Sequence, residues 1–314
     1  MSLAFLFPGQ GSQAVGMGAD LAEAFASARE VFQEIDDALG QRLFKLMREG
    51  DPEELTLTEN AQPALMAVSV AVMRVLEREF GVGVDKAAFV AGHSLGEYSA
   101  LAAAGAISLA DTARLLKLRG QAMQRAVPVG AGAMASLIGP KTDVALAEQA
   151  AAAGAELGVC VVANDNNAGN VVISGEKAAV DRAIEKAKEL GARAIPLNVS
   201  APFHCPLMKP AAEEMAQALA AATIVAPRAP VVANVTARPT HDPEKVRRLL
   251  VEQVTGRVRW RESVQWMAGE GGVTRFAEAG AGKVLTGMTK RLAPDAEALA
   301  LNAPADLEAF AKTL

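Results

Sequence analysis

Short apolar segments alternate with longer helical patterns along most of this chain. Four segments have the length and composition of strands buried on both faces: Leu3–Phe7, Ala87–Ala91, Val231–Val235 and Val273–Ala277. Helical patterns such as Ala61–Phe80 and Leu109–Ala126 lie between them. Strands that alternate with helices pair mainly in parallel, because each helix returns the chain to the same edge of the sheet. The sequence therefore predicts an α/β fold around a largely parallel sheet.

The middle of the chain has a different order of elements. Strands are predicted at Met134–Ile138, Val159–Ala163, Val171–Ser174 and Ala192–Leu197, and helices at Asp143–Ala153 and Lys177–Leu190. This β-α-β-β-α-β order is that of ferredoxin-like domains, with Asn164–Asn170 as the turn between the two central strands. Segments rich in Gly, Pro or Ser flank it on both sides. We therefore expect an inserted ferredoxin-like domain at 128–199, within a catalytic domain formed by 1–127 and 200–314.

Composition excludes several classes of protein. The 314 residues are 51% hydrophobic, which suffices for a large core, and the net charge of -5 argues against a nucleic-acid binder. Cys160 and Cys205 lie outside any CxxC or Cys/His cluster, so we expect neither a disulfide framework nor a metal site. The N-terminus has no basic segment ahead of its apolar run, and Ala100–Ala110 is too short to span a membrane. We expect a cytoplasmic protein with no membrane partner.

A G-x-S-x-G motif, Gly92-His93-Ser94-Leu95-Gly96, follows the second predicted strand and precedes a helix-forming segment. In this context a serine becomes a nucleophile on a strained turn, as in α/β-hydrolase-like folds. The hydroxyl then lies at a helix N-terminus, where backbone N–H groups stabilise negative charge. The alternative is a tight turn with an incidental serine. The strand–turn–helix context favours Ser94 as a nucleophile.

A serine nucleophile needs a base, and the chain has three histidines. The side chain of His93 should diverge from that of its neighbour Ser94. His241 precedes Asp242-Pro243, an N-cap pattern, and is expected in a surface loop. His204 lies where the chain leaves the inserted domain, and such a junction can form a cleft wall. By elimination His204 is the best candidate for the base, with a buried structural histidine as the alternative. No acidic residue between Ser94 and His204 stands out as its partner, so an amide or carbonyl group could orient it.

One arginine lies on the apolar face of the helix predicted at Leu109–Ala126. At about 100° per residue, Arg119 shares an arc with apolar residues that include Leu115 and Met123, whereas the other charged side chains lie opposite. A buried guanidinium needs a partner, because an uncompensated charge costs several kcal/mol. The partner is a buried structural carboxylate or a bound anion, unless the side chain reaches solvent. A bound carboxylate would be held bidentately.

A glycine-containing loop, Phe7-Pro8-Gly9-Gln10-Gly11-Ser12-Gln13-Ala14, follows the first predicted strand. Its spacing formally fits a dinucleotide-binding fingerprint. That interpretation needs an acidic residue at the end of a second strand, and Asp36 and Asp37 lie in a helical stretch instead. We favour a loop whose N–H groups approach a reacting group and form half of an oxyanion hole.

Taken together, these motifs resemble one family. The segments Phe7–Gln13 and Gly92–Tyr98 are similar to the two signature stretches of malonyl-CoA:acyl carrier protein transacylases, and length, insertion and motif order fit over essentially the whole chain. The family includes acyltransferase domains of polyketide and fatty acid synthases. The free-standing bacterial type is the nearer match.

The resemblance implies a role for each matching position. Ser94 is the nucleophile and His204 its base, and the backbone N–H groups of Gln10 and Leu95 form the oxyanion hole. Arg119 binds the malonyl carboxylate, with Met123 beside it, and Gln253 orients His204. The remaining residues assigned to substrate binding are Phe203, which resembles the malonyl-selective form, and the pair Asn164 and Asn166.

The implied reaction is malonyl transfer from malonyl-CoA to acyl carrier protein, through a malonyl-Ser94 intermediate with ping-pong kinetics and no cofactor. We expect acyl carrier protein as partner and a monomer. A serine esterase would share Ser94 and His204 but gives no reason for Arg119, and would hydrolyse malonyl-CoA faster than it transfers the group. A non-catalytic acyl-CoA sensor would not become acylated.

An acidic carrier protein should dock on basic side chains. Two clusters are candidates: Arg257, Arg259 and Arg261, expected to alternate along one strand face, and Lys290-Arg291. The alternative for both is ordinary solvated charge.

Overall fold

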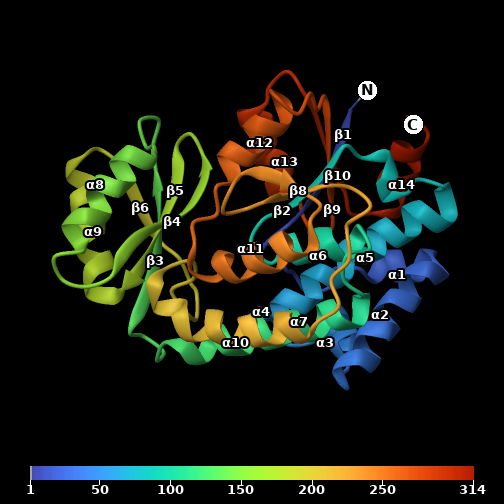
Figure 1. Ribbon diagram of the computed structural model, residues 1–314, viewed down its shortest axis with the longest axis horizontal. Helices are drawn as coiled ribbons and strands as arrows, with labels where there is room; N and C mark the ends of the chain where they lie inside the picture. Colours follow the sequence, from blue (N-terminus) through green and yellow to red (C-terminus); the bar gives the residue numbers. More distant parts are fainter. Residues whose placement is uncertain (1) are drawn as a thin grey trace.

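The computed structural model describes residues 2–314 and is built around two sheets (Figure 1). The larger sheet has the order β10-β9-β1-β2-β7-β8. Its strands are β1 (Leu3–Phe7), β2 (Phe89–Gly92), β7 (Val231–Ala233), β8 (Arg238–Thr240), β9 (Arg275–Ala279) and β10 (Glu297–Leu301). All neighbours pair in parallel except β7 and β8. The predicted α/β fold with a mainly parallel sheet is confirmed.

Both faces of the larger sheet are buried, as the continuous apolar strands predict. Along β1, Leu3, Phe5 and Phe7 enter one hydrophobic cluster, whereas Ala4 and Leu6 enter another. The first cluster includes residues of α2 (Ala26–Leu39), α5 (Thr58–Phe80), α6 (Gly96–Ala103), α7 (Leu109–Ala126), α10 (Lys209–Ala221), α11 (Pro243–Thr255) and α14 (Pro304–Ala311). The second includes residues of α12 (Trp260–Ala268) and α13 (Val284–Leu292).

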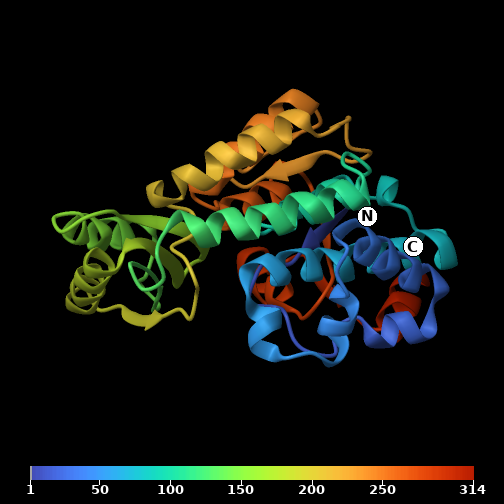
Figure 2. The ribbon, with the colours of Figure 1, turned by 90° about the horizontal axis from the view of Figure 1, so that it is seen from below.

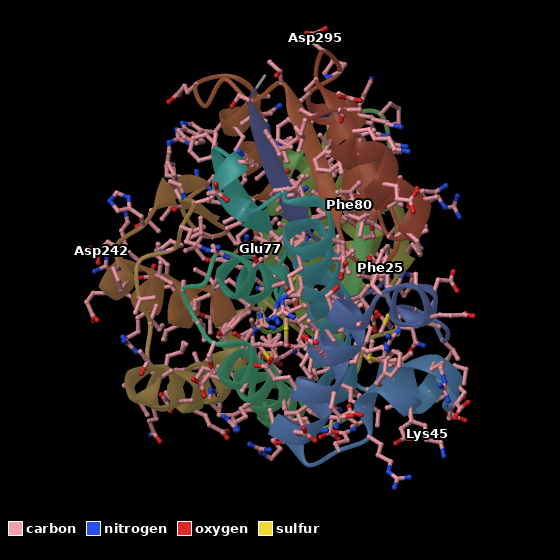
Figure 3. All side chains as sticks on the ribbon, turned by 90° about the vertical axis from the view of Figure 1, so that its right-hand side faces the viewer. Phe25, Lys45, Glu77, Phe80, Asp242 and Asp295 are labelled. Atoms are coloured by element: carbon pink, nitrogen blue, oxygen red, sulfur yellow. The ribbon has the colours of Figure 1, made fainter. Side chains whose placement is uncertain are left out.

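Smaller helices complete the larger body. They are α1 (Ala19–Ala24), α3 (Leu43–Glu49), α4 (Pro52–Thr56), η1 (Val84–Lys86) and η2 (Pro206–Met208). The rings of Phe25, between α1 and α2, and Phe80, at the end of α5, pack edge to face, with centroids 6.0 Å apart (Figure 3). Among residues 2–314 no helix is long and apolar enough to cross a bilayer.

The second sheet contains only elements from the middle of the chain. It has the order β4-β5-β3-β6 with every neighbour antiparallel. Its strands are β3 (Gly132–Ile138), β4 (Cys160–Asn167), β5 (Asn170–Glu176) and β6 (Arg193–Pro196), and its helices are α8 (Val144–Gly154) and α9 (Lys177–Glu189). This is the strand order of a ferredoxin-like unit. Figure 2 shows α7 running from the larger body towards this sheet.

One detail of the predicted hairpin is wrong. Residues 164–167, expected in a turn, belong to β4, and the turn contains only residues 168 and 169. Two polar side chains of this stretch have partners in the larger body: Asp165 pairs with Arg261, and Asn166 bonds His93. Pattern reasoning assigned an Asn-rich stretch to a loop because those partners are not visible in sequence.

The second sheet joins the larger body through backbone hydrogen bonds. The Val258 N–H donates to the Ala163 carbonyl at 2.8 Å, and the Asp165 N–H donates to the Val258 carbonyl at 2.9 Å. The Arg261–Asp165 ion pair, 2.8 Å long, closes the same junction, and Asp165 is buried. We call this set of contacts the β4 junction.

The prediction that Arg257, Arg259 and Arg261 alternate along a strand is wrong. Val258 makes only an isolated bridge, and α12 begins at Trp260. Arg257 pairs with Glu148, Arg259 with Glu262 and Arg261 with Asp165. All three cations are therefore engaged with acidic side chains of this chain.

Candidate active site

The G-x-S-x-G motif forms a sharp turn between β2 and α6. Ser94 has a left-handed backbone, with φ of 53°, which a non-glycine residue rarely adopts. A Cβ on Gly92 would lie 1.9 Å from the backbone of Gly96, and one on Gly96 would lie 2.2 Å from the Phe7 carbonyl oxygen. Only glycine fits either position, so these two glycines are what permits the turn that presents Ser94.

His204 lies against the Ser94 hydroxyl. Its Nε2 is 2.7 Å from Ser94 Oγ, and its Nδ1 is 2.9 Å from the Gln253 carbonyl oxygen and 3.2 Å from that of Gly256. Because carbonyl oxygens only accept, Nδ1 carries the proton, and Nε2 is free to accept the serine proton. The base is therefore oriented by main-chain carbonyls, and Gln253 acts on it through its backbone.

Burial keeps this imidazole neutral. The pKa of His204 is lowered to about 3, mainly by burial and further by the positive charge of Arg119. A neutral Nε2 can accept a proton throughout the physiological pH range.

The other two histidines lie elsewhere. The His93 ring turns away from Ser94, and its Nε2 lies 2.9 Å from Asn166 Oδ1. His241 is exposed, and its neighbour Asp242 caps α11 by accepting from the N–H groups of Glu244 and Lys245. Figure 3 shows Asp242 at the periphery of the molecule. Of the three histidines, only His204 contacts the serine hydroxyl.

Two backbone N–H groups flank the nucleophile without a protein acceptor. Within residues 2–314, neither the Gln10 N–H nor the Leu95 N–H donates a hydrogen bond. The Gly9 loop packs closely on the turn, since a Cβ on Gly9 would lie 2.7 Å from the His93 carbonyl oxygen. Thr58 Oγ1 holds the Gln10 side chain at 2.8 Å. Free donors at a helix N-terminus can bind an oxyanion.

Arg119 is buried beside the nucleophile. Its Nη1 donates to Gln62 Oε1 at 2.8 Å, and its Nη2 donates to Gln253 Oε1 at 2.9 Å and to Ser94 Oγ at 3.2 Å. Only 1% of the residue is exposed, and no carboxylate in the described part of the chain lies within 4 Å of it. Two of the three foreseen partners, solvent and a directly paired structural carboxylate, are thereby excluded. Its buried Nε–H also has no acceptor within residues 2–314.

A cavity of about 260 Å³ opens over these groups. Eight of the ten predicted site residues line it: Gln10, Ser94, Leu95, Arg119, Met123, Asn164, Phe203 and His204. Gln253 and Asn166 lie behind its wall. Met134, Leu197, Asn198 and Val199, which sequence reasoning did not select, contribute further lining from the second sheet and the segment after it.

Comparison with known proteins identifies the family. The family model described as acyl transferase domain matches residues 4–298. This chain belongs to the acyl transferase domain family. The acyl transferase shares 48% identity over 307 residues with the malonyl CoA-acyl carrier protein transacylase of Escherichia coli K12, covering 98% of this chain and 97% of that protein. The corresponding Bacillus subtilis 168 protein is 45% identical over 313 residues, covering 99% and 97%.

Solved structures agree with these sequence relatives. The acyl-carrier-protein-S-malonyltransferase of Bartonella henselae is 54% identical and superposes with a TM-score of 0.97, covering 100% of this chain and 99% of that one. A malonyl-transacylase solved in complex with its type II PKS acyl carrier protein is 44% identical, with a TM-score of 0.96 and full coverage of both chains. The resemblance read from the two signature motifs of the acyl transferase is confirmed.

Three buried polar residues of the acyl transferase site were missed in the sequence. Gln62 bonds Arg119, and Asn234 Oδ1 accepts from the Ser94 N–H at 2.8 Å. Glu97, three residues after the nucleophile, accepts from Asn234 and Gln253. For Asn234 the available signal was a polar residue within the apolar strand predicted at Val231–Val235. Glu97 lies within the signature stretch Gly92–Tyr98 but was assigned no role there, and Gln62, in α5, gave no signal.

Proposed function

We propose that this acyl transferase moves a malonyl group from malonyl-CoA to the phosphopantetheine thiol of an acyl carrier protein, supplying fatty acid or polyketide synthesis. One observation carries the choice of substrate: the buried cation of Arg119 lies 3.2 Å from the Ser94 hydroxyl and has no carboxylate within 4 Å in residues 2–314. A malonyl ester on Ser94 would bring a carboxylate to that cation. The names of the E. coli and B. subtilis relatives support the same reaction.

The first half-reaction acylates the serine. His204 Nε2 takes the Ser94 proton as Oγ attacks the malonyl thioester carbonyl. The Gln10 and Leu95 N–H groups stabilise the resulting oxyanion, and the N-terminus of α6 adds its dipole. The C–S bond then breaks, the proton on His204 goes to the leaving coenzyme A sulfur, and malonyl remains as an ester of Ser94.

In the second half-reaction the thiol is the nucleophile and Ser94 is the leaving group. His204 takes the proton of the phosphopantetheine thiol, whose sulfur attacks the ester carbonyl. The same oxyanion hole holds the intermediate, and Ser94 Oγ leaves and regains the proton from His204. Two transfers through one covalent enzyme give ping-pong kinetics. Phe203 and Met123 would bound the acyl group, and Asn164 would contact the substrate from β4.

The organisation of the chain supports two further assignments. We assign 128–199 to an inserted domain and 1–127 with 200–314 to the catalytic domain, because the second sheet and its helices have a hydrophobic cluster of their own.

We also propose that one copy of the chain is sufficient for activity, since one chain supplies every group used above. Light scattering during gel filtration would test the monomer.

Mass spectrometry of the intact protein tests the function. Incubation with malonyl-CoA should add one malonyl group, peptide mapping should locate it on Ser94, and carrier protein should remove it. Ser94→Ala should remain folded and unlabelled. Hydrolysis faster than transfer would favour an esterase, and a native protein that binds malonyl-CoA without becoming acylated would be a sensor.

A further inference from the structure

Glu97 is a buried carboxylate that the proposed mechanism does not use. It lies in the first turn of α6 and is 2% exposed. No Lys, Arg or His nitrogen lies within 4 Å of it in the described part of the chain. A buried carboxylate without an ion-pair partner is costly, and apolar or neutral residues are usually more stable in such a place. Its presence therefore calls for an explanation other than stability.

Glu97 contacts two residues of the candidate active site, Asn234 and Gln253, and each begins a chain of hydrogen bonds that we call an arm. Its Oε2 accepts from the Asn234 main-chain N–H and from Gln253 Nε2, each at 2.9 Å. These donors lie on segments more than 130 residues away in sequence, so Glu97 is not acting as a local cap of α6.

The first arm runs through Asn234 to the nucleophile turn. Asn234 Oδ1 accepts from the Ser94 N–H at 2.8 Å, and its Nδ2 donates to the Gly92 carbonyl oxygen at 2.7 Å. The Asn234 side chain thus bonds the backbone at two positions of the strained turn. Glu97 fixes the backbone from which that side chain projects.

The second arm runs through the amide of Gln253. Its oxygen accepts from Arg119, and its nitrogen donates to Glu97 and to the Ser94 carbonyl oxygen. A cation on the oxygen side and an anion on the nitrogen side permit only this orientation of the amide. The amide also keeps the two charges apart, so the Arg119 guanidinium is held in place without a carboxylate bound directly to it.

We propose that Glu97 is a positioning residue for acyl transfer: its carboxylate fixes the Gln253 amide, and through it Arg119, and the Asn234 side chain that supports the Ser94 turn. The proposal rests on the proposed function. Loss of the negative charge should let the Gln253 amide rotate and the guanidinium shift. A misplacement of about 1 Å near reacting groups can cost on the order of 100-fold in rate.

The charge on Glu97 should be visible in the pH dependence of acylation. Burial raises the pKa of Glu97 to about 7, against the lowering effect of hydrogen bonds from Asn234 and Gln253 and of the Arg119 charge. The other titratable or charged groups of this site are Tyr98 on α6, His93 in the turn and His204 before η2. Burial lowers the pKa of both His93 and His204, so a loss of rate as the pH falls through about 7 is expected from Glu97, and the profile of Glu97→Gln tests that assignment.

The test measures the rate at which malonyl-CoA labels Ser94, by quenched-flow mass spectrometry between pH 5.5 and 8.5. Native protein should lose rate on the acid side of about pH 7. Glu97→Gln, which keeps an acceptor oxygen without the charge, should be slower at pH 8 by roughly 10- to 100-fold and show no such acid limb. Acetyl labelling should fall less, because it does not need Arg119.

Glu278→Gln is the matched control. Glu278 is also a fully buried carboxylate, but it accepts from the N–H groups of Leu285 and Thr286 at the start of α13. This variant should change stability and keep the native rate and pH profile. Native rate and profile in Glu97→Gln would overturn the proposal. If that variant fails to fold, the absence of an acid limb near pH 7 in native protein overturns it instead. In either case, native labelling by malonyl-CoA shows that the proposed function itself stands.

Discussion

The two residues proposed to exchange the proton, Ser94 and His204, both have left-handed backbones, with φ of 53° and 56°. Such conformations cost of order 1–3 kcal/mol each in residues other than glycine and persist where the surroundings enforce them. Here the surroundings are the Gly92–Gly96 close approach and the carbonyls of Gln253 and Gly256. The catalytic geometry is therefore determined by backbone packing as much as by side-chain identity.

At the residue scale, Arg119→Ala should change substrate preference. It would remove the proposed bidentate pairing with the malonyl carboxylate, and loss of a desolvated pair of this kind typically costs about 2–5 kcal/mol, or on the order of 30- to several-thousand-fold in kcat/KM. Acetyl-CoA should lose less, since it has no carboxylate. Steady-state kinetics with both thioesters measure the ratio. An equal loss for both would mean that Arg119 serves only as a structural donor to Gln62 and Gln253.

Because His204 is buried in its neutral form, the free energy of unfolding should depend on pH. Its pKa is near 3 when folded and near 6.5 in a solvated chain, so between these values the unfolded state binds more protons. The free energy of unfolding should then fall as the pH is lowered from about 6.5 towards 3, by up to about 1.4 kcal/mol per pH unit from this group. Urea denaturation at pH 6.5 and 5 should show a smaller drop for His204→Gln than for native protein. Equal drops would contradict a depressed pKa.

At the scale of elements, α7 depends on its close approach to α5. A Cβ on Gly120 would lie 2.5 Å from the Glu59 Cα and 2.7 Å from the Thr58 carbonyl oxygen, both backbone atoms. Backbone cannot yield as a flexible side chain can. Gly120 therefore sets the distance between the helix that carries Arg119 and the helix that carries its partner Gln62.

Gly120→Ala should consequently destabilise the protein. Overpacking costs about 1–3 kcal/mol, which exceeds the gain of up to about 1 kcal/mol from alanine's helix propensity. Malonyl transfer should fall as Arg119 shifts. Gly287→Ala on α13, where a Cβ meets nothing within 4 Å, should keep activity and gain up to about 1 kcal/mol. Thermal unfolding and kinetics of the pair would test this, and a Gly120→Ala variant as stable as Gly287→Ala would refute it.

The same scale shows what the sequence could and could not reveal. Helix α7 was predicted with correct ends because Ser108 caps it and its apolar arc is continuous, and that arc exposed Arg119 as anomalous. The β4 stretch 164–167 was misassigned because Asp165 and Asn166 find their partners, Arg261 and His93, in the larger body. Gln62, Glu97 and Asn234 act through contacts between distant segments, which local pattern cannot encode.

At the scale of the whole molecule, the ion pairs of three arginines favour one of the two candidate clusters for docking the carrier protein. Arg257, Arg259 and Arg261 each have an acidic partner, whereas Lys290 and Arg291 on α13 are exposed and make no ion pair within residues 2–314. Reversing both charges, Lys290→Glu with Arg291→Glu, should raise the KM for carrier protein and leave Ser94 labelling by malonyl-CoA unchanged. Lys86→Glu is the control, because Lys86 is exposed and lies in η1 instead of α13. An unchanged carrier KM would remove α13 from the docking surface.

The residues that line the cavity come from both sides of the β4 junction. Ser94, Leu95 and Arg119 belong to the larger body, whereas Met134 and Asn164 project from strands of the second sheet, and Met134 packs within the hydrophobic cluster of the larger body. A substitution at Asn164 or Met134 therefore changes the cavity wall without replacing Ser94 or His204. Phe203 and Met123, which are proposed to bound the acyl group, both lie outside residues 132–196. Engineered chimaeras that exchange this segment would therefore vary the wall that Met134 and Asn164 form and keep the proposed acyl-group contacts.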